Sequence, residues 1–199
     1  PDAWGSGNWN TGAFDPKTGM YFAISYTNPG NLGIAPTNVA SATMTHSIPR
    51  EAPSAPKIQG IPLVKPPYGR VTALNMNTGE LEWSVPNGDG PRNHPLLRDL
   101  GLPPLGIPNR PAPLVTRSLL FVGEGSDAVV GTVPGGGGAY DDPDTGYDES
   151  WRWGTLFRAY DKSSGNTVFE IDLSAGTTGA PMTYMHEGKQ YIVVAISSR

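Results

Sequence analysis

The sequence contains one turn motif more than once, and this repetition constrains the fold more than any other feature. Residues 156–173 (LFRAYDKSSGNTVFEIDL) are expected to form two short strands joined by a tight turn, and residues 70–86 (RVTALNMNTGELEWSVP) show the same pattern. A weaker third copy, AFDPKTG, lies at 13–19. Repeated supersecondary units bury their apolar faces by stacking on their neighbours. The chain is therefore expected to be an array of similar packed units.

The two full copies match position by position at one offset of 86 residues. In each copy an Asp or Asn can hydrogen-bond its own backbone two residues further on, and a glycine four positions later supplies the left-handed corner. Local chemistry therefore builds the turn in both copies. The aligned pairs are Ala73 with Ala159, Leu74 with Tyr160, Asn75 with Asp161, Gly79 with Gly165 and Trp83 with Phe169.

Composition favours strands and loops over helices. The 199 residues include 26 Gly and 21 Pro, and no long window repeats apolar residues at helical spacing. A hydrophobic share of 37% and a charged share of 16% are sufficient for one sizeable folded domain. The net charge is -4 with basic residues scattered singly, which argues against a nucleic-acid partner. There is no cysteine, so disulfides and thiolate metal sites are excluded.

The chain has no apolar run of the roughly 18 residues that a membrane-spanning helix needs. It also lacks the charged and apolar start of an export signal. We therefore expect neither a membrane span nor an export signal within it, and its two ends look like cut points in a longer protein.

The predicted hairpins group into four-stranded units, which are the blades of a β-propeller. The expected fold class is all-β, a partial β-propeller of about two and a half blades within a single domain, 1–199. An array without caps exposes apolar surface and strand edges, so the remainder of a propeller or self-association is expected to cover them. The expected units are a blade at 13–86 with a long insertion at 27–69, a blade at 111–173 with an insertion at 124–155, and a half blade at 180–197.

The motif seen in ALNMNTGELEW and AYDKSSGNTVFE resembles the tryptophan-docking repeat of the pyrroloquinoline-quinone (PQQ) dehydrogenases, which are eight-bladed propellers. GNWNTGAFDPKTGMYF and GAPMTYMHEGKQYIVVAI resemble further segments of that family, and PNGDGPRNHPLLRDLGLPPLG is most similar to its glucose-dehydrogenase branch. The resemblance covers essentially the whole chain. It implies a periplasmic or secreted enzyme that oxidises an aldose sugar or an alcohol by hydride transfer to PQQ, with calcium as the metal.

The chain departs from the family pattern in two ways. Phe169 stands where the second repeat usually has Trp, which implies a smaller docking aromatic. The amino-terminal half of the family fold, which supplies most metal ligands and the acidic base, is absent. The resemblance therefore implies a fragment that is inactive on its own, with no catalytic residue and no metal ligand assigned to it.

The resemblance implies four cofactor-binding residues. Asn8 matches the family Asn that reaches the quinone, beside Trp9, and its amide can both donate and accept hydrogen bonds. Trp153, followed by Gly154, falls where the family places a Trp near the cofactor plane. An indole suits that role, since it can lie against a flat ring. Trp151 is the second choice for that role.

Other residues are assigned to structure. Trp83 is expected to pack between blades. The acidic run at 141–149 misses the EF-hand spacing and is expected to be a solvated loop, and the three histidines lack metal-ligand spacing. GGGG at 135–138 lacks the Lys and Ser or Thr of a phosphate loop, and GEGSD is not a nucleophile elbow. Nucleotide binding and serine hydrolysis are therefore discarded.

Two alternatives to the dehydrogenase stay open. Related repeats also occur in non-catalytic propeller scaffolds that bind protein partners and no quinone. The chain could also be stable by itself, with its exposed edges paired in an oligomer.

Overall fold

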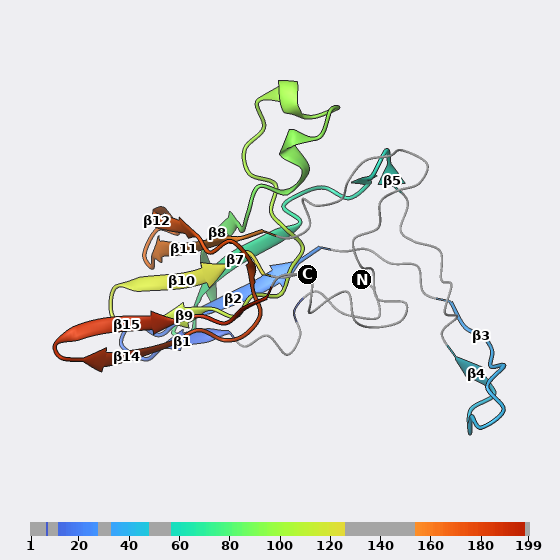
Figure 1. Ribbon diagram of the computed structural model, residues 1–199, viewed down its shortest axis with the longest axis horizontal. Helices are drawn as coiled ribbons and strands as arrows, with labels where there is room; N and C mark the ends of the chain where they lie inside the picture. The colour runs from blue at the N-terminus through green and yellow to red at the C-terminus, as the bar shows by residue number, and fades with distance from the viewer. Residues whose placement is uncertain (1–6, 8–11, 28–32, 48–56, 126–153, 198–199) are drawn as a thin grey trace.

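The computed structural model describes residues 7, 12–27, 33–47, 57–125 and 154–197. Strands gather at one end of the molecule, and a small β-hairpin lies at the other end (Figure 1). This arrangement is an all-β partial propeller, as the sequence predicted.

The first sheet has four antiparallel strands in the order β1-β2-β7-β8. Its two hairpins come from distant parts of the chain, because a long insertion separates β2 from β7. The predicted hairpins at 13–26 and 70–86 are confirmed. The strands are β1 (Ala13–Asp15), β2 (Met20–Tyr26), β7 (Gly69–Asn75) and β8 (Glu80–Pro86).

The second sheet repeats this plan in the order β9-β10-β11-β12. A third hairpin, β14–β15, follows it, together with a short pair formed by β13 and β16. The strands are β9 (Leu114–Val115), β10 (Leu119–Gly123), β11 (Leu156–Asp161), β12 (Thr167–Asp172), β13 (Gly176–Thr177), β14 (Met182–His186), β15 (Lys189–Val193) and β16 (Ile196–Ser197).

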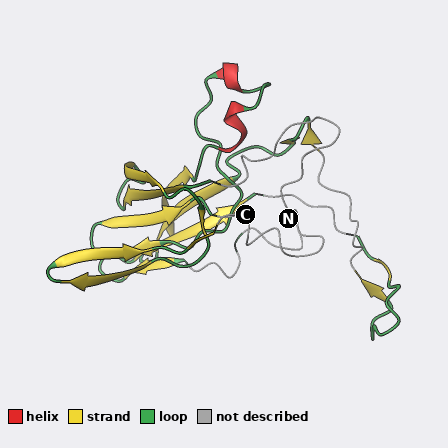
Figure 2. Cartoon of the chain, in the orientation of Figure 1, coloured by secondary structure: helices red, strands yellow, loops and turns green. Residues whose placement is uncertain are grey.

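The long connections between strands contain little regular structure. The described parts of the insertion after β2 contain two short antiparallel pairs, and two 3-10 helices lie between β8 and β9 (Figure 2). These elements are β3 (Ala35–Pro36) with β4 (His46–Ser47), β5 (Lys57–Ile58) with β6 (Ile61–Pro62), η1 (Gly90–Asn93) and η2 (Arg98–Leu100).

The three repeated turns form as their sequences predict. The Asp15 carboxylate accepts the N–H of Lys17 at 3.1 Å, Asn75 accepts that of Asn77 at 3.0 Å, and Asp161 accepts that of Ser163 at 2.9 Å. The glycine that ends each turn has a positive φ, between +73° and +79°. The three turns lie at one edge of the two sheets, which we call the turn edge. At the opposite edge, the loop edge, β2, β8 and β10 end and β7 and β11 begin.

The main core lies between the first and second sheets. Phe22 and Val71 from the first sheet and Leu120 and Val122 from the second have no exposed surface. Each such side chain contributes about 1.5–3 kcal/mol when it is removed from water. The remaining buried members of this core are Ala13, Ile24, Ala73, Trp83 and Tyr160.

Apolar side chains stay exposed on the outer strand of the second sheet and on the third hairpin. Phe169 on β12 is 58% exposed and Met185 on β14 is 65% exposed. The third hairpin also exposes an aromatic pair, Tyr184 and Tyr191, whose ring centroids lie 5.2 Å apart. Exposed apolar side chains that gather in this way are typical of a surface that another element covers.

Candidate functional site

Trp83 docks the first sheet onto the second. Its indole N–H donates to the backbone carbonyl of Lys162 at 2.9 Å, and its side chain is 8% exposed. The ring lies against Gly165, where an added Cβ would come within 2.7 Å of the indole Cε3. Gly165 is therefore needed both for the left-handed turn and for the ring that packs on it. The expectation that Trp83 packs between blades is confirmed.

A buried ion pair reinforces this contact at the turn edge. The Lys162 ammonium contacts the Asp15 carboxylate of the first sheet and donates to the Thr116 carbonyl at 3.0 Å. Asp15 is 5% exposed. The bond from Lys162 is the main cause that lowers the pKa of Asp15, and bonds from Thr18 and the Lys17 backbone add to it. Lys162 therefore joins the two sheets through both its backbone and its side chain.

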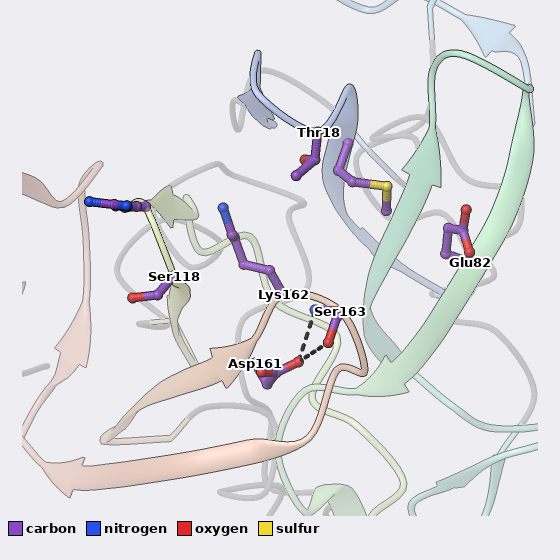
Figure 3. A pocket seen from close by; sticks show the side chains of 8 residues that line it. Thr18, Glu82, Ser118, Asp161, Lys162 and Ser163 are labelled. Carbon is purple, nitrogen blue, oxygen red and sulfur yellow. Dashed lines mark hydrogen bonds between the residues drawn. The ribbon is translucent and has the colours of Figure 1, made fainter.

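A cleft of about 370 Å³ opens beside these contacts at the turn edge. Three of its charged groups have partners, since Asp161 is hydrogen-bonded within its turn, Lys162 to Asp15, and Glu82 to Asn75 at 2.8 Å. Figure 3 draws the lining side chains, six of them labelled, and the bonds from Ser163 to Asp161. The cleft is lined by Thr18, Met20, Glu82, Arg117, Ser118, Asp161, Lys162 and Ser163. It lies at the opposite edge from Gly154, the predicted cofactor contact that the structure describes.

The loop edge contains a second buried charge cluster, which the sequence did not indicate. Glu124, directly after β10, is 4% exposed, and its Oε1 lies 2.7 Å from Nη1 of Arg158 on β11. Arg158 also donates through Nε to Glu170 on β12 at 3.2 Å. Burial disfavours the charged guanidinium, but the Glu124 carboxylate outweighs this effect and raises the pKa of Arg158 above its ordinary value. Arg158 therefore links β11 to the end of β10 on one side and to β12 on the other.

Asn87 extends this polar cluster to the first sheet. Its side-chain amide donates to the Gly123 carbonyl at 2.9 Å and accepts the Tyr160 hydroxyl at 3.1 Å, and Asn87 is only 1% exposed. Burial is the main cause that raises the pKa of Tyr160 to about 12. Tyr160 therefore remains a neutral hydrogen-bond donor at physiological pH. The sequence signal for Asn87 was only an Asn-Gly pair after a strand, which indicates a turn and not a buried amide.

Gly154 is the one predicted cofactor-binding residue that the structure describes. It lies at the loop edge beside the end of β10, where its N–H points to the Gly125 carbonyl at 3.5 Å. A Cβ at this position would fall 1.8 Å from Oε2 of Glu124, so Glu124 occupies the space of a side chain. Only the backbone of Gly154 can therefore contact a ligand. Asn8, Trp9 and Trp153, with the second choice Trp151 and the acidic run at 141–149, lie outside the described residues.

The structure describes all three histidines, of which one is buried and two are exposed. His94 is 2% exposed, its Nε2 lies 2.8 Å from the Gln59 carbonyl, and its Nδ1 accepts the Leu96 N–H at 3.1 Å. His46 and His186 are exposed. Within 12–27, 33–47, 57–125 and 154–197, no group of three or more His, Cys, Asp or Glu side chains is placed to hold a metal ion.

Among the residues that the structure describes, no helix has both the length and the apolar character to cross a membrane.

Comparison with known proteins gives one consistent result. Residues 1–133 and 151–192 match the family model described as the PQQ glucose/ethanol/alcohol dehydrogenase β-propeller domain. The chain is 26% identical to quinate/shikimate dehydrogenase (quinone) of Acinetobacter baylyi over 98% of its own length and 24% of the relative. It is 24% identical to the glycerol dehydrogenase large subunit of Gluconobacter thailandicus over 96% of its own length and 26% of the relative. With quinoprotein glucose dehydrogenase of Escherichia coli, identity is 26% over 68% of the chain and 14% of the relative.

Solved structures show the same fold. A quinohemoprotein alcohol dehydrogenase from Pseudomonas putida superposes with a TM-score of 0.59 at 16% identity, over 100% of this chain and 23% of that one. The corresponding enzyme from Comamonas testosteroni gives a TM-score of 0.56 at 21% identity, over 98% of this chain and 23% of that one. The chain thus spans about a quarter of the length of these proteins.

Proposed function

Because the chain belongs to the PQQ glucose/ethanol/alcohol dehydrogenase β-propeller family, we propose that it forms part of a quinone-dependent dehydrogenase. The proposed reaction is oxidation of an aldose sugar or an alcohol, with PQQ as cofactor and calcium as its metal, in the periplasm or outside the cell. The related proteins are named for quinate or shikimate, glycerol and glucose, all of which carry several hydroxyl groups. We therefore favour a polyhydroxylated substrate.

The observation that carries this proposal is the docking of Trp83 on the Lys162 carbonyl. This bond joins two four-stranded sheets through the repeated motif. It supports stacking of the sheets around a common axis, which is how a propeller creates a central pocket.

We propose that the cofactor side of this chain is the loop edge. The proposed contacts are Asn8 and Trp9, which precede β1, and Trp153 with Gly154, which precede β11. The turn edge is a poorer candidate, because Lys162, Glu82 and Asp161 beside its cleft are already bonded within the protein. When bound, PQQ would supply the hydride acceptor and calcium would polarise it. The chain would supply an orienting amide and a flat aromatic surface.

We further propose that the remaining blades of the propeller are the partner of the exposed apolar face. Phe169 occupies the position of Trp83 in the second repeat, yet it is 58% exposed where Trp83 is 8% exposed. The next sheet of a propeller would cover Phe169 as the second sheet covers Trp83. This partner accounts for the exposed aromatics on β12, β14 and β15.

Quinone uptake tests the proposal. The protein is mixed with PQQ and Ca²⁺, and the quinone absorbance is followed, with dye reduction measured in the presence of glucose, glycerol or quinate. A shifted absorbance without dye reduction is expected for this chain alone, and dye reduction is expected when the remaining blades are added. Absence of any quinone binding by the completed ring would contradict the proposal and favour a scaffold. Mass in solution tests the exposed face, since a well-behaved monomer at high concentration would contradict the partner that we assign to it.

A further inference from the structure

The Glu124 carboxylate lies where three segments of the loop edge meet. One oxygen, Oε2, accepts the Leu156 N–H at 3.2 Å and occupies the space beside Gly154, where a Cβ would fall 1.8 Å away. The other oxygen, Oε1, would lie 3.1 Å from a Cβ at Gly88, which follows the last strand of the first sheet. One buried side chain therefore contacts the end of β10, the approach to β11 and the segment after β8.

Two of these contacts require glycine for different reasons. Gly88 has a φ of +91°, a conformation that other residues rarely adopt, whereas Gly154 is not among the positive-φ residues. Gly154 is therefore required by space alone. The carboxylate of Glu124 is what takes up that space.

The charge of Glu124 is balanced within its own sheet. Arg158 holds it at 2.7 Å from the neighbouring strand, and Arg158 in turn reaches Glu170 on the outer strand. A buried ion pair contributes little net stability compared with apolar side chains of the same size, because both ions must be desolvated. The main effect of such a pair is to fix the positions of the groups that it contacts.

The ion pair at the turn edge fixes a different geometry. Asp15 and Lys162 come from different sheets and lie beside the docked Trp83, so they hold the sheets together. Glu124 directly follows β10 and Arg158 lies on β11, two strands that are already paired by backbone hydrogen bonds. The additional groups that Glu124 contacts are the Leu156 N–H and the backbone of Gly154.

We propose that Glu124, held by Arg158, is a positioning residue that fixes the backbone of Gly154 to Leu156 at the loop edge and so sets the quinone contacts made there. This inference rests on the proposed function, because the ligand of the loop edge is the quinone. Glu124 has no role in hydride transfer itself. It acts through the backbone that it holds.

The test compares two isosteric substitutions in buried ion pairs, one at each edge. Glu124→Gln keeps an oxygen that can accept the Leu156 N–H but removes the charge that Arg158 holds, and Asp15→Asn makes the matched change at the turn edge. Each variant and the unmodified chain are titrated with PQQ in the presence of Ca²⁺, and urea unfolding is measured in parallel. We expect Glu124→Gln to weaken PQQ binding roughly tenfold, the lower end of the loss seen when a residue that supports a metal ligand is replaced. Asp15→Asn is expected to leave PQQ affinity unchanged. It is expected to lower the urea unfolding midpoint at least as much as Glu124→Gln does.

Gly154→Ala provides a second variant that leaves the ion pair chemically intact. Its methyl group displaces either the carboxylate or the backbone, so a similar loss of PQQ affinity is expected. Equal PQQ affinity in Glu124→Gln, Gly154→Ala and the unmodified chain would overturn the inference. Equal loss in Glu124→Gln and Asp15→Asn would also overturn it, because the effect would then be one of general stability.

Hydrogen exchange separates a failure of this inference from a failure of the proposed function. If the unmodified chain takes up no PQQ, the proposed quinone site fails for this chain, and the exchange rate of the Leu156 amide decides whether Glu124 positions the segment. Glu124→Gln is expected to accelerate that amide relative to the Phe121 amide within β10, whereas Asp15→Asn is expected to change neither. An unchanged Leu156 rate in Glu124→Gln would overturn the positioning role.

Discussion

Replacement of Trp83 by phenylalanine tests the docking contact between the sheets. Phenylalanine is the natural residue at the equivalent position of the second repeat, Phe169, so the substitution stays within the chemistry of the motif. It preserves a ring against Gly165 and beside Phe22, whose centroid lies 5.9 Å from that of Trp83. It removes the N–H that donates to the Lys162 carbonyl at 2.9 Å.

The expected loss follows from that bond and from the smaller ring. A carbonyl left without its donor in a largely buried site costs about 1–3 kcal/mol. The space left by the smaller ring adds to this cost, so Trp83→Phe is expected to lower the free energy of unfolding by about 2–3 kcal/mol. Complete removal of the ring in Trp83→Ala is expected to cost about 3–5 kcal/mol. These are large fractions of the total stability of a domain, about 5–15 kcal/mol.

Phe169→Ala is the matched control, because Phe169 is 58% exposed whereas Trp83 is 8% exposed. Its expected effect is within about 0.5 kcal/mol, as for a surface substitution. Urea unfolding followed by circular dichroism measures all three variants. Similar losses in Trp83→Phe and Phe169→Ala would refute the reasoning, since the two aromatics would then contribute equally despite their different surroundings.

Three further outcomes are expected. Gly165→Ala should destabilise the chain more than Gly79→Ala in urea unfolding: both glycines have a positive φ, but a Cβ at Gly165 meets Trp83 at 2.7 Å and a Cβ at Gly79 meets nothing within 4 Å. The pKa of Asp15 is below its ordinary value of 3.8 in the folded chain, so its contribution to stability is present above that value and is lost as the pH falls through the folded-state pKa. Asp15→Asn should therefore reduce the difference in unfolding midpoint between neutral pH and about pH 3, and an unchanged difference would argue against the pair with Lys162. Tyr160→Phe should cost about 1 kcal/mol in the same assay through loss of the bond to Asn87, and a neutral result would show that this bond makes no net contribution.

The hairpins could be predicted because local chemistry determines them. The turns at Asp15, Asn75 and Asp161 form from residues within five positions of one another, and the strands that flank them follow directly. The contact of Trp83 with the second sheet was predictable only through the repeat, since the bond to Lys162 spans 79 positions. No local sequence pattern predicts a contact between residues so far apart in the chain.

The charged groups that the sequence analysis missed have long-range partners. Asp15 and Lys162 are 147 positions apart, and Glu124 bonds Leu156 across 32 positions. Glu124 was predicted to begin the insertion at 124–155. The cofactor contacts Asn8, Trp9, Trp153 and Gly154 came from resemblance to a family, and they stay predictions.

On the proposed function, the two edges of the sheets have different roles, one in joining the sheets and the other in ligand geometry. At the turn edge, Trp83, Lys162 and Asp15 join one sheet to the next, so changes there alter how strongly the sheets associate. At the loop edge, Arg158 pairs with Glu124 within the second sheet, and Glu124 accepts the N–H of Leu156, the first residue of β11, so changes there are expected to alter where that backbone lies. A propeller assembled from repeats needs the first kind of contact in every blade, because each blade must bind its neighbour. On the proposed function, it needs the second kind only where a blade contributes to the pocket.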